Sequence, residues 1–251
     1  MREYLVLKSL AAASLGLSAL CSGGASAAEL TVFCTQALRT SCLELAPRFT
    51  AATGHKVNLV VAPSGQLVKK IEAGETGDLL IANDRNIDAL IKDKKVTGER
   101  VDLARAQVGV SIKAGGPRPD ISTPEALRKT LLEARTIAYS AGGLSGNNFE
   151  NAMKKLGILD EVKKKAISAS PAAKAVVSGE ADFAVQQISE LIAVEGAELL
   201  GPLPGALDQV TQFSMGVLSD SKQKDIARAM LDYLRTPEAQ GMIKAKGLTP
   251  G

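Results

Sequence analysis

Tryptophan is absent from this sequence, and the other aromatic residues are scarce. Among 251 residues, Phe, Tyr and Trp together make up 3%. The protein therefore has few aromatic side chains on which nucleic-acid bases could stack. No charge of one sign dominates either, because 30 Lys and Arg face 27 Asp and Glu, a formal net charge of +3. Proteins that bind nucleic acid need a dense basic surface, so these features argue against nucleic acid as a partner.

Signatures of cofactor and metal enzymes are also missing. His55 is the single histidine, and it follows a glycine just before a predicted strand, where an exposed turn position is expected. The sequence contains no G-x-S-x-G nucleophile elbow, no Walker A loop and no G-x-G-x-x-G fingerprint. No spacing of His and Cys suits zinc. We therefore expect no cofactor, no bound metal and no Ser-His-Asp catalysis.

The first residues have the parts of a signal peptide. Arg2 and Lys8 precede a short apolar run over residues 9–20, and residues 25–27 are small, as a signal peptidase requires. We expect residues 1–28 to form a signal peptide and the mature chain to be periplasmic. A membrane-spanning helix needs about 20 apolar residues, more than this run supplies.

A lipid anchor on Cys21 is a second alternative to the signal peptide. The residue before it is Leu20, whereas a lipid-modified cysteine normally follows a small residue. We therefore favour cleavage that leaves Ala28 or Glu29 as the first residue.

Short apolar runs alternate with stretches of helical spacing along the rest of the chain. Strands are predicted at residues 30–33, 56–62, 78–82, 107–113, 136–140, 182–186 and 209–219. Helices are predicted at residues 37–52, 65–73, 86–96, 122–134, 147–156, 161–166, 171–178 and 222–246. This alternation predicts an α/β fold with mainly parallel sheets.

Two long predicted strands, 107–113 and 209–219, divide the pattern into two series of β-α units. We expect residues 29–107 and 209–251 to form one lobe and residues 108–208 an inserted second lobe. Two hinge crossings and a ligand cleft between the lobes follow from this division.

The cysteines Cys34 and Cys42 remain after removal of the signal peptide. Two cysteines in an exported protein commonly form a disulfide. However, Cys34 ends a predicted strand, and Cys42 is expected more than two turns into the following helix. A disulfide requires Cα atoms within about 7 Å, and this arrangement would place the two cysteines farther apart. We therefore expect two free thiols, that of Cys34 being the more acidic because it lies at a helix N-terminus.

Several predicted strands end in small polar residues that open a helix. These turns are Cys34-Thr35-Gln36, Ser64-Gly65-Gln66, Ser145-Gly146-Asn147 and Ser168-Ala169-Ser170. Open α/β sheets bind ligands at this edge, and helix N-termini favour anions. One such turn is an ordinary helix cap, but two per lobe favour a shared anion site. Arg39, one turn into its helix, either binds a carboxylate or is a solvated surface residue.

The order of these motifs resembles the molybdate-binding-protein family of periplasmic solute receptors. The matching segments are residues 30–33, 37–39, 64–67, 71–74, 77–81, 145–147, 185–190, 233–234 and 237–239. The resemblance implies a type II periplasmic-binding fold and a receptor that feeds an ABC importer. It also implies that neutral hydroxyls and backbone N–H groups hold a tetrahedral oxyanion, with Cys34, Ser64 or Gly65, Ser145 and Ser170 at or next to those contacts.

Three positions depart from the molybdate-binding pattern. Cys34 stands where a hydroxyl residue is usual, Gln187 where a tyrosine is frequent, and Asn147 adds an amide. Together with Arg39, these amides suit an organic acid. Some members of the broader family act as aconitate isomerases, so the resemblance leaves an enzyme as the alternative.

We expect a receptor, monomeric in solution, that captures one small anion for membrane subunits of an ABC transporter. The candidate ligand-binding residues are Cys34, Thr35, Arg39, Ser64, Gly65, Ser145, Gly146, Asn147, Ser170 and Gln187. The first alternative is a cofactor-independent aconitate isomerase that uses the same cleft, with Cys34 and Arg39 as catalytic candidates. A weaker alternative is a signalling receptor.

Overall fold

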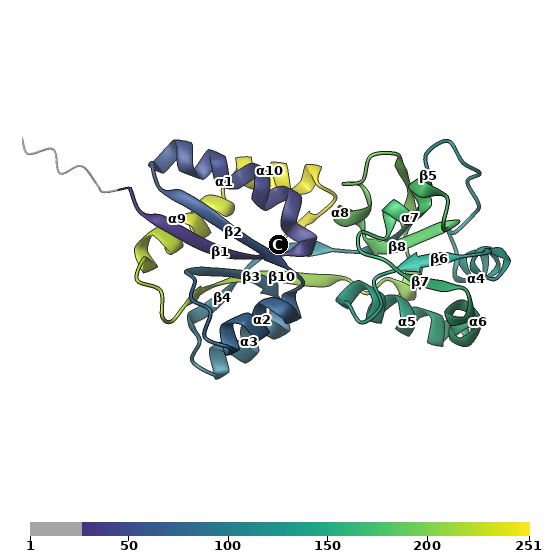
Figure 1. Ribbon diagram of the computed structural model, residues 1–251, viewed down its shortest axis with the longest axis horizontal. Helices are drawn as coiled ribbons and strands as arrows, with labels where there is room; N and C mark the ends of the chain where they lie inside the picture. The colour runs from purple at the N-terminus through teal and green to yellow at the C-terminus, as the bar shows by residue number, and fades with distance from the viewer. Residues whose placement is uncertain (1–26) are drawn as a thin grey trace, which may run out of the picture.

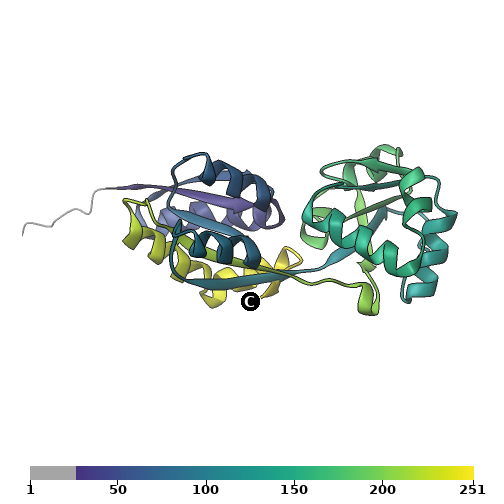
Figure 2. The ribbon, with the colours of Figure 1, turned by 90° about the horizontal axis from the view of Figure 1, so that it is seen from below.

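The computed structural model describes residues 27–251, which form two lobes, each built around its own sheet (Figures 1 and 2). The first sheet has six strands in the order β11-β4-β10-β3-β1-β2, and the second has five in the order β7-β6-β8-β5-β9. The structure thus confirms the predicted α/β class. The predicted signal peptide lies outside the described residues, except for its last two positions.

The first lobe combines the N-terminal elements with those at the end of the chain (Figure 1). Its strands are β1 (Glu29–Thr35), β2 (Lys56–Ala62), β3 (Leu79–Asn83), β4 (Val96–Ala106), β10 (Thr211–Leu218) and β11 (Thr249–Pro250). Its helices are η1 (Gln36–Leu38), α1 (Arg39–Thr53), α2 (Ser64–Glu72), α3 (Asp84–Lys92), α9 (Lys224–Leu234) and α10 (Pro237–Ala245). Strand β1 pairs in parallel with β2 and β3, so their carboxyl ends share one edge.

The second lobe is formed by the middle of the chain. Its strands are β5 (Val108–Lys113), β6 (Ile137–Tyr139), β7 (Ala166–Ser168), β8 (Phe183–Gln187) and β9 (Ala197–Pro202). Its helices are α4 (Pro124–Glu133), α5 (Leu144–Leu156), α6 (Leu159–Lys164), α7 (Ala173–Ser178), α8 (Ile188–Leu191) and η2 (Gly205–Leu207). Strand β6 is parallel to β7 and β8.

Both sheets are mixed, because five of the nine strand pairs are antiparallel, so the prediction of mainly parallel sheets is wrong. Helices nevertheless pack on both faces of each sheet. In the first lobe, one buried cluster includes Leu45, Met230 and Ile243 from α1, α9 and α10. A second cluster includes Leu67 and Ile87 from α2 and α3. Opposite faces of one sheet thus each have their own apolar core.

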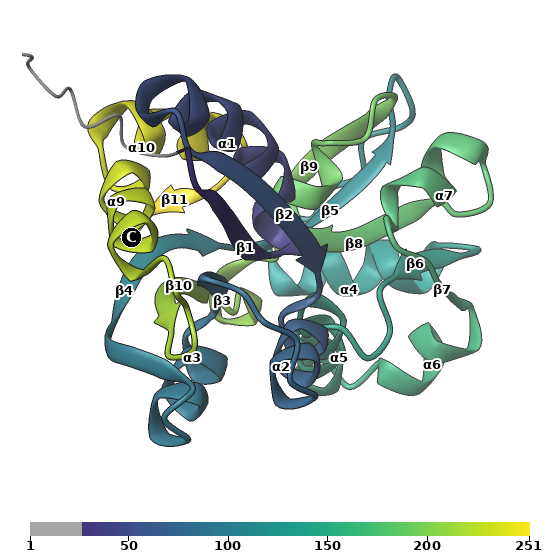
Figure 3. The ribbon, with the colours of Figure 1, turned by 60° about the vertical axis from the view of Figure 1, so that its left-hand side comes forward.

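The chain passes between the sheets twice. Gln107 separates β4 of the first sheet from β5 of the second, and residues 208–210 lead from η2 back to β10 (Figure 2). The side-chain amide of Gln107 donates a hydrogen bond to Asp208, so the two crossings are tied side by side. Figure 3 shows that β1 and β2 run toward the lobe that contains β6 and β8.

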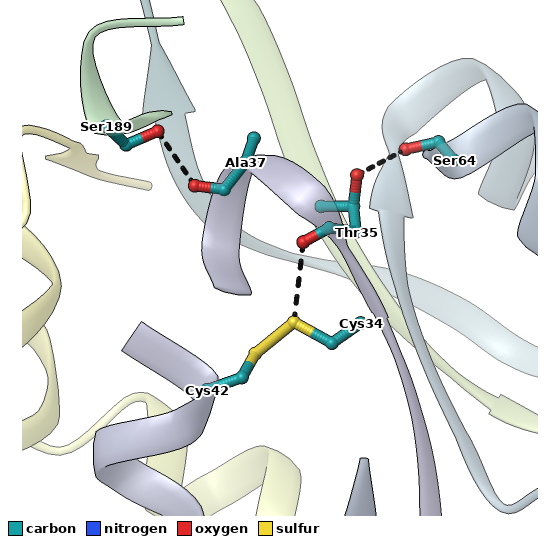
Figure 4. Close-up of a disulfide and its surroundings, with 6 residues drawn as sticks. All are labelled: Cys34, Thr35, Ala37, Cys42, Ser64 and Ser189. Atoms are coloured by element: carbon teal, nitrogen blue, oxygen red, sulfur yellow. Dashed lines mark hydrogen bonds between the residues drawn. A yellow bond between two sulfur atoms is a disulfide. The ribbon is translucent and has the colours of Figure 1, made fainter. Parts of the chain in front are cut away.

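The prediction of two free thiols is wrong, because Cys34 and Cys42 form a disulfide with their Cα atoms 7.0 Å apart (Figure 4). The error lies in the expected start of the helix. The chain first makes the short helix η1, and α1 begins only at Arg39, which places Cys42 in its first turn. The chain thereby doubles back over the end of β1.

Candidate functional site

A cavity of about 410 Å³ lies where the carboxyl ends of strands from both sheets face each other. The predicted residues that line it are Thr35, Ser64, Gly65, Ser145, Ser170 and Gln187. The first three come from the first lobe and the last three from the second. The structure therefore brings all four predicted turns to one cavity, two from each lobe, and the end of β8 completes its wall.

Two hydroxyls form the wall of the first lobe. Thr35 is the last residue of β1, and Ser64 is the first residue of α2. Their side-chain oxygens lie 2.8 Å apart, within hydrogen-bond distance (Figure 4). The backbone N–H of Asn83 donates to Ser64 Oγ at 3.3 Å. Both side chains are buried, so this network fixes their orientation. The first turn of α2 adds backbone N–H groups that no intrahelical carbonyl can satisfy.

The wall of the second lobe contains a turn without a side-chain cap. Residues 140–143 connect β6 to α5, and Gly143 stands at the N-cap, where no side chain accepts a hydrogen bond. Ser145 is buried in the first turn of this helix and lines the cavity. The uncapped N–H groups and the hydroxyl are hydrogen-bond donors suited to an anion.

Gln187 adds an amide at the end of β8. Its Nε2 lies 3.4 Å from Thr211 Oγ1, while its Oε1 is buried without a hydrogen-bond partner among residues 27–251. The amide of Asn148 also donates to Thr211 Oγ1 at 3.4 Å, which leaves the hydroxyl proton of Thr211 free to donate. The Gln187 amide can therefore turn over, accept from Thr211 and present its N–H₂ to an anion.

The other predicted residues do not line this cavity. Cys34 is fully buried in the disulfide. Gly146 packs against the β6–α5 turn, where an added Cβ would lie 2.0 Å from the Ser140 carbonyl oxygen. Asn147 is exposed on α5. His55 precedes β2, and its Nδ1 accepts a hydrogen bond from the Ala28 N–H at 3.3 Å, at the opposite edge of the sheet.

Arg39 lines a second cavity of about 780 Å³, which shares Gln36 and Glu190 with the first. Across this second cavity stands Lys174 of α7, in the other lobe. Both cations are exposed, and neither forms an ion pair within residues 27–251. The cleft thus continues past Glu190 into a region with one unpaired cation from each lobe.

Glu190 is the functional candidate that the sequence-based prediction missed. It lies in the short helix α8 and accepts a hydrogen bond from Gln186 Nε2 at 3.0 Å. Burial raises the pKa of its carboxyl from 4.5 to about 7, against the opposing effect of hydrogen bonds from Gln187 and Gln186. The sequence did contain a signal, because Gln186-Gln187-Ile188-Ser189-Glu190 is another strand end that opens a helix.

A direct bridge between the lobes lies next to Glu190. Ser189 Oγ donates to the carbonyl oxygen of Ala37 at 2.8 Å, and both residues are buried (Figure 4). Helix α8 of the second lobe therefore packs on η1 of the first. Any molecule in either cavity lies beside this junction.

The raised pKa of Glu190 predicts a pH-dependent effect of Glu190→Gln on stability. The native carboxyl keeps its proton up to about pH 7, whereas the unfolded chain releases it near 4.5. Native-state stability therefore falls as pH rises through this window, and the loss is complete above it. Because Gln stays neutral, we expect Glu190→Gln to stabilise the protein by about 1–2 kcal/mol at pH 8 and by little at pH 5, allowing for partial exposure.

Urea unfolding of both proteins at pH 5 and pH 8 measures this difference. Glu161→Gln, on the exposed face of α6, is the matched control and should show no such pH dependence. Equal effects of Glu190→Gln at both pH values would contradict the assignment. The charged groups that line the same cavities are Arg39, Lys69, Lys174 and Glu195.

Within residues 27–251, no three His, Cys, Asp or Glu side chains are grouped so that they could bind a metal ion. No helix of this part of the chain has the length and apolar character needed to cross a membrane.

Two α/β lobes, two crossings and a polar cavity between facing strand ends define a two-lobed solute-binding architecture. The periplasmic molybdate-binding protein of Azotobacter vinelandii has the same fold, with a TM-score of 0.72, 22% identity and coverage of 88% of this chain and 98% of that one. This confirms the type II periplasmic-binding fold. The family model for bacterial extracellular solute-binding proteins matches residues 30–249, and the chain belongs to this family.

Curated relatives include both an enzyme and binding proteins. An aconitate isomerase from a Pseudomonas species is 31% identical over 229 residues, which cover 88% of this chain and 87% of the relative. The molybdate-binding protein ModA of Escherichia coli K12 is 26% identical, with coverage of 94% and 96%. The predicted resemblance to molybdate-binding proteins is thereby confirmed.

Proposed function

We propose that this protein is a periplasmic receptor that closes its two lobes on one small anion and delivers it to the membrane subunits of an ABC importer. The observation that carries this proposal is that Ser64 and Ser145, from opposite lobes, line one cavity. Closure of such lobes around a ligand is the usual hinge motion of this architecture. Residues 29–107 with 209–251, and residues 108–208, would move as the two bodies, in a monomeric protein.

The donors of the cavity favour an anion over a neutral or cationic ligand. The hydroxyls of Thr35, Ser64 and Ser145 are joined by helix N-termini from both lobes. The extension of the cleft toward Arg39 and Lys174 favours an organic acid with more than one carboxylate, because a tetrahedral oxyanion would leave that region empty. Membership of a solute-binding family supports the same reading.

Removal of either serine hydroxyl is expected to weaken anion binding. Ser64→Ala and Ser145→Ala should each cost about 1 kcal/mol of binding free energy, and more if the lost acceptor is charged. Isothermal titration calorimetry of each variant checks this. Ser122→Ala, at an exposed position outside both cavities, is the control. Unchanged affinity in both cavity variants would remove these residues from the site.

A thermal-shift screen of oxyanions and organic acids tests the proposed function. A ligand at a hundredfold excess over its Kd stabilises the native state by about 2.7 kcal/mol. The panel should contain molybdate, sulfate, citrate and cis- and trans-aconitate. We expect a clear rise in melting temperature with at least one of these anions. A flat response to all of them would contradict an anion receptor of this kind.

A second candidate function is a cofactor-independent aconitate isomerase in the same cleft. Its support is the 31% identity with the aconitate isomerase of a Pseudomonas species, together with the position of Glu190 in the cleft. Cys34 drops out as a catalytic candidate because a disulfide sulfur provides no thiolate. Arg39, which lines the second cavity, remains the candidate that binds a carboxylate of the substrate.

A further inference from the structure

Glu190 stands at the junction of the two cavities of the cleft. It lines both of them, and of the residues of the described chain only Gln36 shares this position. Its carboxyl is half-buried and accepts hydrogen bonds from the side-chain amide of Gln186, at 3.0 Å, and from the backbone N–H of Gln187, both of them neutral groups. No cation neutralises it in an ion pair within residues 27–251. A carboxyl that lacks an ion pair and lines both cavities is placed to contact a ligand bound there.

Anchors for carboxylates lie on either side of Glu190. The first cavity offers the hydroxyls of Ser64 and Ser145 with the N-termini of α2 and α5. The second offers the unpaired cations Arg39 and Lys174. A ligand with carboxylates bound in both regions spans the junction of the two cavities, which Glu190 and Gln36 line.

We propose that Glu190 is the catalytic base of this cleft, which removes a proton from a carbon of a bound unsaturated polycarboxylate and returns it to another carbon. The inference rests on the isomerase alternative and on anion binding in the cleft. The Glu190 carboxylate takes a proton from a methylene group next to a C=C bond. The released electron pair forms a new C=C bond with the neighbouring carbon, and the original π pair moves to the far carbon. The Glu190 carboxylic acid then protonates that carbon.

This step balances without any other reactant. Substrate and product have the same formula, and Glu190 ends as the carboxylate with which it began. The charge that develops on the carbon chain spreads into the adjoining carboxylates, which the anchors at both ends hold. The charged groups that line the two cavities with Glu190 are Arg39 and Lys69 of the first lobe and Lys174 and Glu195 of its own lobe.

The pKa of the Glu190 carboxyl, as well as its position, suits the role of a base. A base is most effective when its pKa lies near the working pH. Burial brings the pKa of Glu190 to about 7, well above that of an exposed glutamate. We therefore expect kcat/KM to rise with pH through this region, as the carboxylate becomes populated. A bound polyanion should shift the rise of kcat to higher pH, because like charges favour the protonated carboxyl.

The test is to mix purified mature protein with trans-aconitate, follow formation of the cis isomer by NMR, and measure binding in parallel by calorimetry. We expect steady turnover by the wild-type protein and a fall of at least about 100-fold in kcat for Glu190→Gln, with trans-aconitate still bound. Glu190→Asp, which keeps a carboxyl, should recover part of the rate and its pH dependence. Glu161→Gln, an exposed carboxyl outside both cavities, should turn over as the wild type does.

The outcomes separate this inference from the receptor proposal. Binding without turnover by the wild-type protein would overturn the catalytic role of Glu190 and leave an anion receptor. Turnover that persists in Glu190→Gln would also overturn it, while keeping the enzyme. If the wild-type protein bound none of the anions in the thermal-shift panel, both the receptor and the base would be refuted.

Discussion

Gly146→Ala is expected to destabilise the second lobe by about 3 kcal/mol or more, because the site has no room for a methyl group. An added Cβ would lie 2.0 Å from the carbonyl oxygen of Ser140 and 2.9 Å from its carbonyl carbon. These are backbone atoms of the turn that leads into α5, so no side-chain rotation can relieve the contact. The close approach of helix to turn is what positions Ser145 at the cavity.

Gly65→Ala provides the matched control for this prediction. Gly65 also lies in the first turn of a helix, α2 of the other lobe, but an added Cβ there meets nothing within 4 Å. Thermal unfolding should show a melting temperature lowered by roughly 6–12 °C for Gly146→Ala, taking about 2–4 °C per kcal/mol for a chain of this size. Equal melting temperatures for the two variants would contradict the packing described for α5.

Deletion of the disulfide has the second large expected effect. The bridge joins residues eight apart in the sequence and closes a short loop around η1. A loop of this size should contribute about 2–3 kcal/mol through the unfolded chain. We expect Cys34→Ala/Cys42→Ala to lose this amount of unfolding free energy, measured by urea denaturation. The loss should also loosen the end of β1, where Thr35 enters the cavity.

Reduction and alkylation provide the controls for the disulfide. A reducing agent should destabilise the wild-type protein and leave the double variant unchanged. The native, unreduced mature protein should take up no thiol label at either cysteine. Labelling of Cys42 without prior reduction would contradict the bridge.

The alternation of strands and helices was predictable because each element has a strong local signal. Residues 56–62 are apolar enough to show β2 with its observed bounds. Thr123 and Pro124 likewise predict the start of α4, where Thr123 Oγ1 accepts a hydrogen bond from the Ala126 N–H at 3.1 Å. In contrast, β4 was missed. It lies between β10 and the short β11, and its sequence mixes Gly98 with several charged residues, since much of it is exposed.

The candidate site was predictable as a set of turns but not as a set of side chains. Successive residues of a strand point to opposite faces, so Thr35 lines the cavity while Cys34 is buried in the core. Around the first turn of α5, Ser145 faces the cavity and Asn147 faces solvent. Glu190 was missed although a strand end precedes it, because its place at both cavities and the burial of its carboxyl depend on the packing of the folded chain.

The most direct test of the account is calorimetric titration of trans-aconitate and molybdate into the mature wild-type protein and into Ser64→Ala/Ser145→Ala. We predict saturable binding of one anion per chain for at least one of the two ligands, weakened more than tenfold in the double variant, since two hydrogen bonds of about 1 kcal/mol each are lost. Absence of binding by the wild-type protein, or equal affinities in both proteins, would contradict an anion site between the lobes.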